Sequence, residues 1–251
     1  MDVELFEETC RRYIGAKRKK GPIGTLSEKT LHVILKNCFE PDISKQEVKV
    51  GKFYADILND SGITEIQTGN FGALRKKLAA FLPEYNVRIV YPVSRIKNVV
   101  WIDPETGETS APHKSPKKGV ISDILPELYR ISEFLLDEKL IFTVVLLDTV
   151  EYRLKNGWGR DGKRGSERYD LIPVSYIADA DFCVSSGYSG LLPEGLPDSF
   201  DSKIFSAVTK RVGRNCSYSL GALNCLGLIE KIRGEGRSVV YYKIEKKDGI
   251  D

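Results

Sequence analysis

The most constraining feature of the sequence is a succession of short apolar segments between residues 28 and 91, in which the period changes from helix to strand and back. A helical pattern over about Glu28–Cys38 is followed by three segments of strand length, separated by turn-forming residues. A second helical pattern, about Asn70–Phe81, ends at Pro83. The predicted strands are Gln46–Val50, Phe53–Leu58, Ile63–Gln67 and, after the second helix, Val87–Tyr91. This order of helix, three strands, helix and strand predicts an α/β unit with a mostly buried central strand.

The segments around this unit are less regular. Met1–Lys20 is expected to form a short acidic helix that runs into a basic arm, and Trp101–Lys118 is rich in Pro, Thr, Gly and Lys, which indicates an exposed loop. A helix is predicted over about Ser122–Leu136. The strongly apolar stretch Leu140–Val150 is expected to add a strand to the first sheet. Lys155–Arg168, basic and rich in glycine, is typical of the tip of a long hairpin.

The C-terminal part of the chain has a different pattern. Two short helices are predicted over Asp201–Val212 and Ser217–Leu226, with the polar turn Gly213–Cys216 between them. Two strands, 228–232 and 238–244, follow and are joined by a basic turn. Since Ser, Gly and Pro are dense just before this region, residues 183–197 are expected to be a linker. The predicted domains are therefore a core at 1–182, the linker at 183–197 and a small domain at 198–251.

Composition excludes several classes of site. The chain is 41% hydrophobic, and no apolar run approaches the roughly 20 residues that cross a bilayer. Its start is acidic, unlike a secretory signal, so a cytoplasmic location without membrane contact is expected. The five cysteines are scattered and the chain has two histidines, which disfavours structural zinc and a disulfide framework. Any hydrolytic chemistry is therefore expected to use carboxylates.

Basic residues are clustered although the net charge is only +3. Each cluster alone is more often a solvated face than a binding site, but several clusters in a near-neutral chain imply surfaces that attract polyanions. The clusters lie at Arg11–Arg12, Lys17–Lys20, Arg75–Lys77, Lys114–Lys118, Arg160–Arg168, Lys210–Arg214 and Lys231–Arg237.

Two carboxylates on neighbouring predicted strands are the main candidates for chemistry. Glu65 and Gln67 are two positions apart on one strand and share a face, and a hairpin brings Asp56 to the same place. The backbone carbonyl of Ile66 adds a third oxygen. Such a set of hard oxygen ligands suits Mg²⁺ or Mn²⁺, which activates water for the hydrolysis of phosphodiesters. An alternative is that both acids are solvated surface groups.

The element order and the pattern of Asp56 followed by Glu65-x-Gln67 and a helix resemble the PD-(D/E)XK nuclease superfamily. The resemblance implies a restriction-endonuclease-like αβββαβ core with a mixed central sheet. It also implies that Asp56 and Glu65 bind metal and that Glu28, on the first helix, completes the site. The third motif position is usually Lys, and here Gln67 is expected to position water without supplying a positive charge. A binding-only core that has lost its catalytic function is the alternative.

The C-terminal helices and hairpin resemble the winged-helix family. That resemblance implies that the helix beginning at Ser217 reads DNA and that the hairpin is the wing. An alternative use of such a domain is protein contact, including dimerisation. The residues expected to contact DNA are Arg75, Lys76, Lys77, Arg160, Lys163, Arg164, Arg214, Asn215, Ser217, Tyr218, Arg233 and Arg237.

These features together predict a metal-dependent DNA endonuclease with winged-helix DNA binding. Two alternatives stay open: a catalytically degenerate DNA-binding regulator, and a protein-interaction scaffold that dimerises through the winged helix. A homodimer is compatible with the first prediction because cutting both strands of a duplex usually requires two sites. The DNA structure or sequence that is bound, and the biological pathway, are left open.

Overall fold

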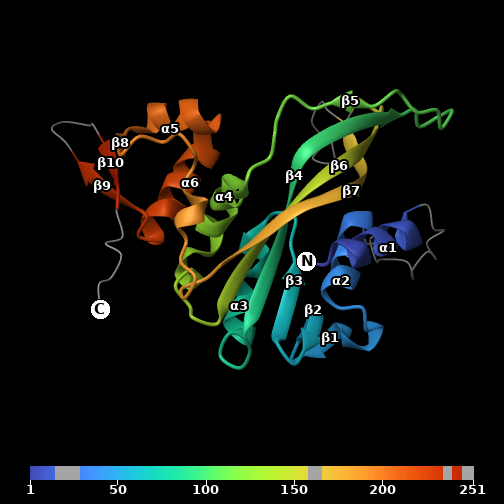
Figure 1. Ribbon diagram of the computed structural model, residues 1–251, viewed down its shortest axis with the longest axis horizontal. Helices are drawn as coiled ribbons and strands as arrows, with labels where there is room; N and C mark the ends of the chain where they lie inside the picture. The colour runs from blue at the N-terminus through green and yellow to red at the C-terminus, as the bar shows by residue number, and fades with distance from the viewer. Residues whose placement is uncertain (15–28, 158–165, 234–238, 245–251) are drawn as a thin grey trace. The chain divides into compact units, whose positions relative to one another are not determined.

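The computed structural model of the chain describes residues 1–14, 29–157, 166–233 and 239–244 (Figure 1). It is a mixed α/β structure, as the sequence predicts. Its contacts divide the chain into two compact units. Unit 1 comprises residues 1–66, 92–120 and 144–180, and unit 2 comprises residues 67–91, 121–143 and 181–251. Each unit therefore combines segments from both halves of the sequence.

Three short antiparallel strands begin the larger sheet. They are β1 (Gln46–Val50), β2 (Phe53–Asn59) and β3 (Gly62–Ile66). Their register pairs Val48 with Ala55 and Leu58 with Ile63. Gly51 and Gly62 lie in the two connecting turns with φ angles of 58° and 112°, which glycine adopts without a steric penalty. The strands predicted at 46–50, 53–58 and 63–67 are confirmed to within one residue.

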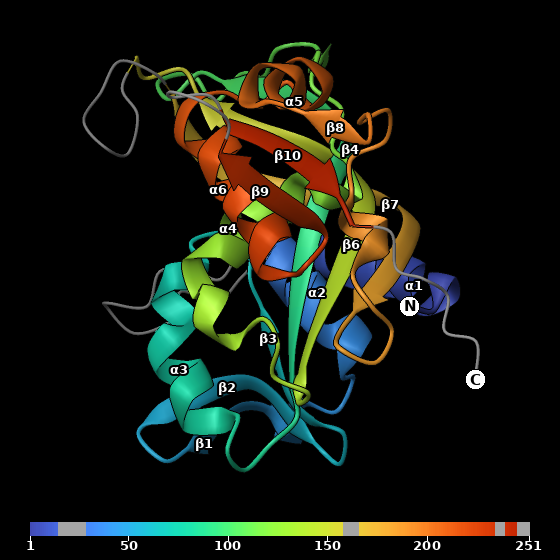
Figure 2. The same cartoon turned by 90° about the vertical axis from the view of Figure 1, so that its left-hand side faces the viewer.

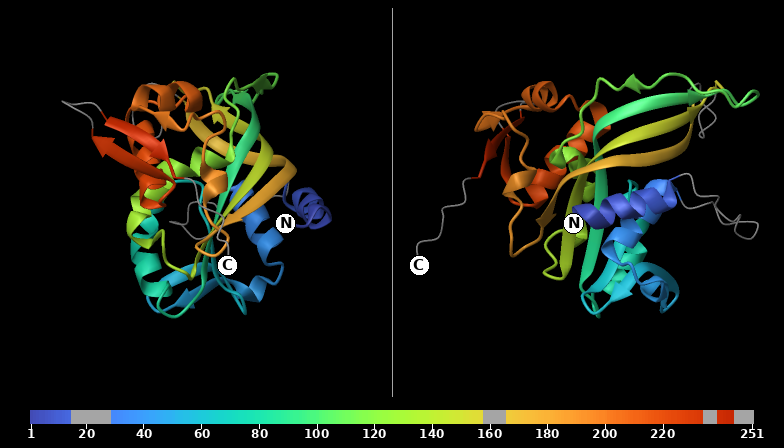
Figure 3. Two further views of the ribbon diagram at one scale, coloured as in Figure 1. Left: turned by 60° about the vertical axis from the view of Figure 1, so that its left-hand side comes forward. Right: turned by 45° about the vertical axis from the view of Figure 1, so that its right-hand side comes forward.

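Three long strands complete this sheet, whose order is β1-β2-β3-β4-β6-β7, with β5 beside β4. The right-hand view of Figure 3 shows the long strands side by side. Their bounds, with that of the short strand, are β4 (Val87–Ile102), β5 (His113–Lys114), β6 (Leu140–Leu154) and β7 (Glu167–Phe182).

Side-chain contacts give the direction of the long strands. Along β4 and β6 the partners advance together, from Ser94 with Thr149 to Lys97 with Glu151. This is the pattern of a parallel pair, whereas β1, β2 and β3 are antiparallel. The larger sheet is therefore mixed, as expected from the sequence.

The α-helices among the described residues of unit 1 are α1 (Val3–Tyr13) and α2 (Thr30–Phe39). The Asp2 carboxylate accepts a hydrogen bond from the Leu5 amide and caps the start of α1. The first amide of α2, that of Thr30, donates to the Asp170 carboxylate on β7 at 3.1 Å. The apolar face predicted for this helix is buried, with Ile34 and Leu35 fully inaccessible.

Unit 2 contains a second, three-stranded sheet of order β8-β10-β9. Figure 2 shows this sheet with α5 and α6. The helix α5, which follows β8, is capped by Asp201, which accepts hydrogen bonds from two amides of the first turn. The elements of unit 2 outside the long strands are α3 (Arg75–Phe81), α4 (Leu125–Leu128), β8 (Ser199–Phe200), α5 (Ser202–Thr209), α6 (Gly213–Cys225), β9 (Ile229–Arg233) and β10 (Val239–Lys243).

The helix predicted over 122–136 is wrong as a single element. The chain instead forms a 3-10 turn, the short α4 and a further 3-10 segment, Tyr129–Phe134. Pro126 is tolerated because it lies in the first turn of α4. Ile131 leaves the helical region, with φ −126° and ψ 31°, and is fully buried. Burial of this side chain thus takes precedence over the regular helical period.

The prediction of an exposed loop at 101–118 is wrong in part. The strand expected at Val87–Tyr91 continues to Ile102, and β5 folds back on it with Val99 opposite His113. An isolated bridge between Ile102 and Thr109 extends the pairing. The apolar and β-branched residues near the end of β4 favour this extension, although Pro and Gly follow them in the sequence.

The turn predicted at Gly213–Cys216 is also wrong, because these residues are the first turn of α6. The break between the two helices lies earlier, at Lys210, whose φ is 57°. Cys216 is buried, and its Sγ lies 3.7 Å from the carbonyl oxygen of Ser202 on α5. Packing of this small side chain between the helices extends α6 toward its N-terminus.

The segment predicted to be a linker, residues 183–197, packs into unit 2. Tyr188, Leu191 and Leu196 are buried, and the Tyr188 hydroxyl donates to the Leu135 carbonyl at 2.7 Å. The compact units divide the chain at 66/67, 91/92, 120/121, 143/144 and 180/181, the last of which lies within two residues of the predicted boundary at 182. Within the described ranges, no helix has the length and apolar character needed to cross a membrane.

Candidate functional site

The register of β2 and β3 places Asp56 and Glu65 on one face of the sheet. Ile57 lies opposite Thr64, and Leu58 lies opposite Ile63. The next positions along the same register are Asp56 and Glu65. Opposed residues of an antiparallel pair project to the same side, roughly 5 Å apart at Cβ. The spatial relation on which the predicted metal site depends is therefore consistent with the pairing of the strands.

Asp56 makes two contacts that fix its carboxylate. The Ile66 amide on β3 donates to Asp56 Oδ2 at 2.7 Å, so the side chain takes the place of a backbone acceptor beyond the end of the ladder. His32 Nε2, on α2, lies 3.3 Å from the same oxygen. The Asp56 side chain is only 14% exposed. The carboxylate is thus oriented by two neighbouring elements rather than solvated.

Glu65 is buried more deeply, with 2% of the residue exposed. Ile63, two positions before Glu65 in the strand, and Ile66, the next residue, are each 1% exposed. A carboxylate in such surroundings is strongly disfavoured unless hydrogen bonds or opposite charge compensate for the lost water. This burial excludes the alternative in which Glu65 is an ordinary solvated surface group.

His32 is the site residue that the sequence analysis missed. It lies four residues after Glu28 in the sequence, in the helix that was predicted to start at Glu28, and residues four apart share one side of a helix. That spacing was the signal that would have identified it. Lys36, a further turn along α2, is also buried, and its Nζ lies 2.6 Å from Glu47 on β1. The same side of α2 therefore carries an imidazole and a buried ammonium group.

The other two residues of the predicted site are Gln67 and Glu28, and the structure describes only Gln67. The Gln67 side-chain amide donates to the carbonyl of Gly69, within the turn that follows β3. The Gln67 backbone amide donates to the Val90 carbonyl at 2.9 Å. Glu28 lies outside the described residues. The Gln67 side chain is thus fixed by its own turn, while its amide oxygen keeps the capacity to accept a hydrogen bond.

Among the residues that the structure describes, no group of three or more His, Cys, Asp or Glu side chains is arranged to hold a metal ion. The predicted set contains two such carboxylates, Asp56 and Glu65, with the carbonyl of Ile66 as the third oxygen. Mg²⁺ is commonly held by only one or two carboxylates, with water in its other positions. The donor chemistry of the pair therefore fits Mg²⁺ better than a metal that requires a full set of side-chain ligands.

The basic residues predicted on α3 differ in their surroundings. The Arg75 guanidinium lies 2.5 Å from the Glu133 carboxylate, and its side chain is 58% exposed. Lys76 is exposed and Lys77 is half-buried. An exposed ion pair of this kind contributes little stability and is easily exchanged for another anion. Arg75 and Lys76 therefore remain accessible to a phosphate.

The predicted reading helix, α6, presents two different faces. Arg214, Asn215 and Ser217 are exposed. Tyr218 instead packs against the Tyr129 ring, with 5.0 Å between ring centroids, and the Arg130 guanidinium lies 5.4 Å from its centroid. The aromatic ring of Tyr218, which was expected at the exposed start of the helix, is therefore part of the packing of unit 2.

The other predicted DNA contacts are not placed by the structure. Arg160, Lys163, Arg164 and Arg237 lie outside the described residues. The backbone of Arg233 ends β9. The predicted phosphate contacts in the β6–β7 connection and at the tip of the wing thus remain predictions.

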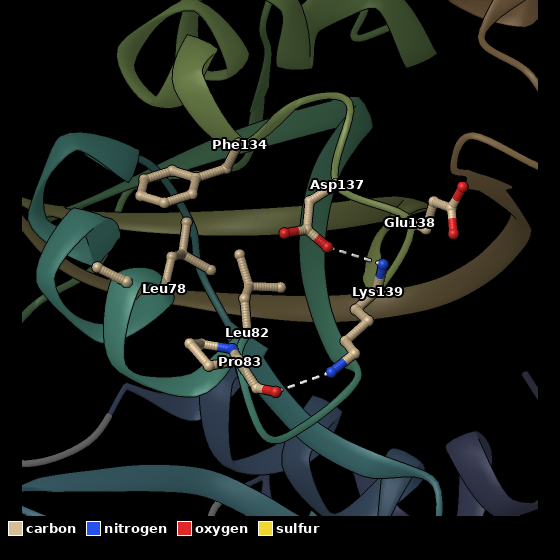
Figure 4. Close-up of a pocket in the computed structure, with 8 residues that line it drawn as sticks. Leu78, Leu82, Pro83, Phe134, Asp137, Glu138 and Lys139 are labelled. Atoms are coloured by element: carbon tan, nitrogen blue, oxygen red, sulfur yellow. Dashed lines mark hydrogen bonds between the residues drawn. The ribbon is translucent and has the colours of Figure 1, made fainter.

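A shallow pocket of about 540 Å³ lies in unit 2, and Figure 4 shows its lining. Apolar side chains of α3 form one wall, and Lys139 reaches across to donate to the Pro83 carbonyl at 2.9 Å. The Lys139 amide donates to the Asp137 carboxylate at 2.9 Å. The lining is Leu78, Ala79, Leu82, Pro83, Phe134, Asp137, Glu138 and Lys139. None of the predicted catalytic residues lines this pocket.

Comparisons with known proteins add a family but no activity. A family model described as "Domain of unknown function (DUF8091)" matches residues 29–183. An uncharacterized protein of Treponema pallidum (strain Nichols) is 29% identical to the chain over 222 residues, which cover 88% of this chain and 87% of the relative. No solved structure matches the chain. The family segment includes α2 and β1 to β3, which carry the candidate site, and ends before α5 and α6.

Proposed function

The chain belongs to the family described as a domain of unknown function (DUF8091), and from its own residues we propose that it is a metal-dependent DNA endonuclease. The observation that carries the proposal is the shielding of two carboxylates on adjacent strands, Asp56 and Glu65, which the register of Ile57 with Thr64 sets opposite each other when it is continued by one position. Two shielded acids on adjacent strands, Asp56 and Glu65, concentrate negative charge and oxygen ligands in one place, which favours binding of a cation. A divalent cation is a natural compensating charge for such a pair.

Asp56 and Glu65 would hold the cation, together with the carbonyl oxygen of Ile66. When bound, Mg²⁺ would polarise the scissile phosphate and supply an activated water. The surroundings of the two acids orient them: the Ile66 amide and His32 fix the Asp56 carboxylate, and burial restricts Glu65. Such fixed orientation reduces the reorganisation needed when charge develops on the phosphate.

The order of elements supports a PD-(D/E)XK-like core. The chain runs α2, β1, β2, β3, α3 and β4, which matches the αβββαβ order of that superfamily. Gln67 in place of the usual Lys is the departure. Because glutamine supplies no positive charge, the resemblance supports metal binding more directly than it supports a fast rate of cleavage. A DNA-binding protein without catalysis is accordingly the second candidate function.

The C-terminal elements support DNA contact through a winged-helix-like arrangement. The chain order is β8, α5, α6, β9 and β10, and the small sheet pairs β10 with both β8 and β9. In winged-helix proteins the second helix enters the major groove. On α6, the residues available for this role are Arg214, Asn215 and Ser217, which are exposed. DNA is therefore the proposed partner, and Mg²⁺ or Mn²⁺ the proposed cofactor.

The first prediction tests the carboxylate pair. Asp56→Asn and Glu65→Gln should each reduce nicking of supercoiled plasmid in Mg²⁺ or Mn²⁺ by roughly a hundredfold or more, because loss of even an outer-sphere partner of a metal costs about 10- to 100-fold. The measurement is the initial rate of nicking, repeated with branched and single-stranded DNA.

Asp60→Asn is the matched control. Asp60 is an exposed acid in the turn between the same two strands, so its replacement removes the same charge without touching the pair. Thermal unfolding of each variant separates loss of activity from loss of fold. Equal nicking by all four proteins would remove the assignment. Wild-type DNA binding without nicking in either metal would favour the second candidate function.

A further inference from the structure

Three cations in unit 1 converge on one carboxylate. Glu151, on β6, is 0% exposed. Lys97 Nζ on β4 lies 3.0 Å from its Oε2, Arg168 Nε on β7 lies 3.3 Å from the same oxygen, and Arg153 Nε contacts Oε1. We call Lys97, Glu151, Arg153 and Arg168 the Glu151 cluster. It spans three adjacent strands of the sheet, which lie about 4.8 Å apart.

The charges of the Glu151 cluster do not balance. One carboxylate faces three cations, so two positive charges remain, and no other carboxylate among the described residues forms an ion pair with these cations. Burial raises the pKa of Glu151, but hydrogen bonds and charge from Lys97, Arg168 and Arg153 outweigh it, and the net pKa is lowered from the ordinary 4.5. The carboxylate is thus ionised at neutral pH, and among the described residues the cluster carries an excess of positive charge.

A neighbouring ion pair shows what a balanced arrangement looks like in the same strands. Arg95 on β4 binds Asp148 on β6 through two parallel hydrogen bonds, Nε to Oδ1 at 2.9 Å and Nη2 to Oδ2 at 2.7 Å. Each charge there has one opposite partner, in the bidentate geometry that satisfies both groups. The Glu151 cluster differs in having too few acceptors for its donors.

The terminal guanidinium nitrogens of Arg153 and Arg168 are hydrogen-bond donors of the kind that binds phosphate. The closest nitrogen to Glu151 is Nε in both Arg153 and Arg168. Arg153 Nη1 has a long hydrogen bond of 3.4 Å to Ser166 Oγ, and the described residues provide no acceptor for the terminal nitrogens of Arg168. The side chains are 33% and 46% exposed, respectively. A planar guanidinium that presents its terminal nitrogens to solvent is suited to bind a phosphate through two hydrogen bonds.

We propose that the Glu151 cluster binds the phosphodiester backbone of DNA, with Glu151 acting to orient Arg153 and Arg168. The contact is independent of base sequence because guanidinium and ammonium groups reach only phosphate oxygens there. It places a DNA-contacting surface on the long strands of unit 1. The inference rests on the proposed function only in taking DNA as the partner, and it requires no cleavage.

The test is DNA affinity of the full-length chain without a divalent metal. Arg168→Gln and the double variant Arg153→Gln/Arg168→Gln leave Lys97 to neutralise Glu151, so both should fold. Fluorescence anisotropy with a labelled random-sequence duplex should show roughly tenfold weaker binding per arginine removed. The slope of log affinity against log salt should fall in magnitude by about 0.9 for each lost phosphate contact.

Arg95→Gln is the matched control, because it removes the same charge from the same sheet but from a balanced pair. Its affinity and salt slope should stay close to those of the wild type. An unchanged affinity in the folded double variant would overturn the proposal, as would equal weakening by Arg95→Gln. Tight binding of inorganic phosphate that Arg168→Gln abolishes, with DNA affinity unchanged, would assign the cluster to free phosphate and equally overturn it.

The same proteins keep this inference separate from the proposed nuclease function. Weaker DNA binding by the double variant, in a protein whose wild type never nicks DNA, would support the Glu151 cluster and remove the endonuclease. Nicking that depends on Asp56 and Glu65, with DNA affinity unchanged in the Arg153 and Arg168 variants, would support the endonuclease and overturn the role of the Glu151 cluster.

Discussion

Two buried carboxylates, Glu65 and Glu151, show how single residues constrain this sheet. Glu65 lies between Thr64 and Ile66 in the sequence, and Glu151 contacts cations from three strands. Removing one partner of a buried ion pair costs about 3–5 kcal/mol, because the other charge stays buried without compensation. The cations around Glu151 are partly exposed, so water screens them when the carboxylate is lost.

We therefore predict that Glu151→Gln lowers the free energy of unfolding by about 2–3 kcal/mol at neutral pH, somewhat less than for a fully buried pair. The free energy of unfolding of this variant should also decrease less than that of the wild type as the pH is lowered. The folded-state pKa of Glu151 is lowered, so its stabilising contribution is present above the ordinary pKa of 4.5 and is lost as pH falls through the folded value. Urea denaturation from neutral pH down to about pH 3 measures both effects.

The wild type is the reference for the pH dependence of Glu151→Gln, because the two proteins share every other titrating group. Asp148 also has a lowered pKa, caused chiefly by the hydrogen bond from Arg95, so the wild type and Glu151→Gln share that part of the acid sensitivity. Only the difference between the two curves reports on Glu151. Parallel curves below pH 5 would contradict the prediction.

At the scale of elements, β4 depends on a glycine that is far from it in sequence. The Gly119 amide donates to the carbonyls of Ser94 and Arg95, both at 3.1 Å. A Cβ at position 119 would lie 2.3 Å from the Ser94 carbonyl oxygen and 2.6 Å from a methyl group of Val93. The returning chain thus approaches the strand more closely than any side chain permits.

Gly119→Ala is accordingly predicted to lower the free energy of unfolding by about 2 kcal/mol or more, the range typical of overpacking against atoms that cannot move aside. Chemical denaturation of the purified variant provides the measurement. Gly72→Ala is the control, because its added Cβ would meet nothing closer than 4.0 Å. Similar effects of the two substitutions would show that the close approach at Gly119 is relaxed in solution.

At the scale of the whole molecule, the C-terminal segment and the middle of the chain form one compact unit. Residues 181–251 cluster with 67–91 and 121–143. The Arg211 guanidinium, 7% exposed, lies 2.9 Å from Asp123, and Gly221 on α6 abuts the Tyr129 ring. Leu125 and Leu128 of α4 are fully buried. α6 therefore packs on elements that precede it by about 90 residues in the sequence.

This arrangement predicts that residues 198–251 do not fold alone. A fragment of that segment should lack a cooperative thermal transition, and the chain truncated after 197 should unfold at a lower temperature or aggregate, because α4 loses its covering helix. Circular dichroism of both fragments and of the full chain tests this. Cooperative unfolding of the isolated fragment, together with an unchanged transition in the truncated chain, would instead support an independent domain.

Local patterns in the sequence were sufficient for the elements that neighbouring residues specify. The strands at 46–50, 53–59 and 62–66 follow from alternation and from turn residues such as Gly51, and the buried face of α2 follows from its helical period. The register that relates Asp56 to Glu65 is also specified locally, because a hairpin with a short turn fixes the pairing of its own strands.

Only the tertiary structure decided features that depend on distant residues. The Glu151 cluster joins three strands, so no window of sequence shows that Lys97 and Arg168 share a carboxylate. The inward direction of Tyr218 depends on Tyr129, and the interrupted helix at 122–136 depends on the burial of Ile131. Side-chain spacing along one segment determines which residues share a face, whereas the partner of each face is set by long-range packing.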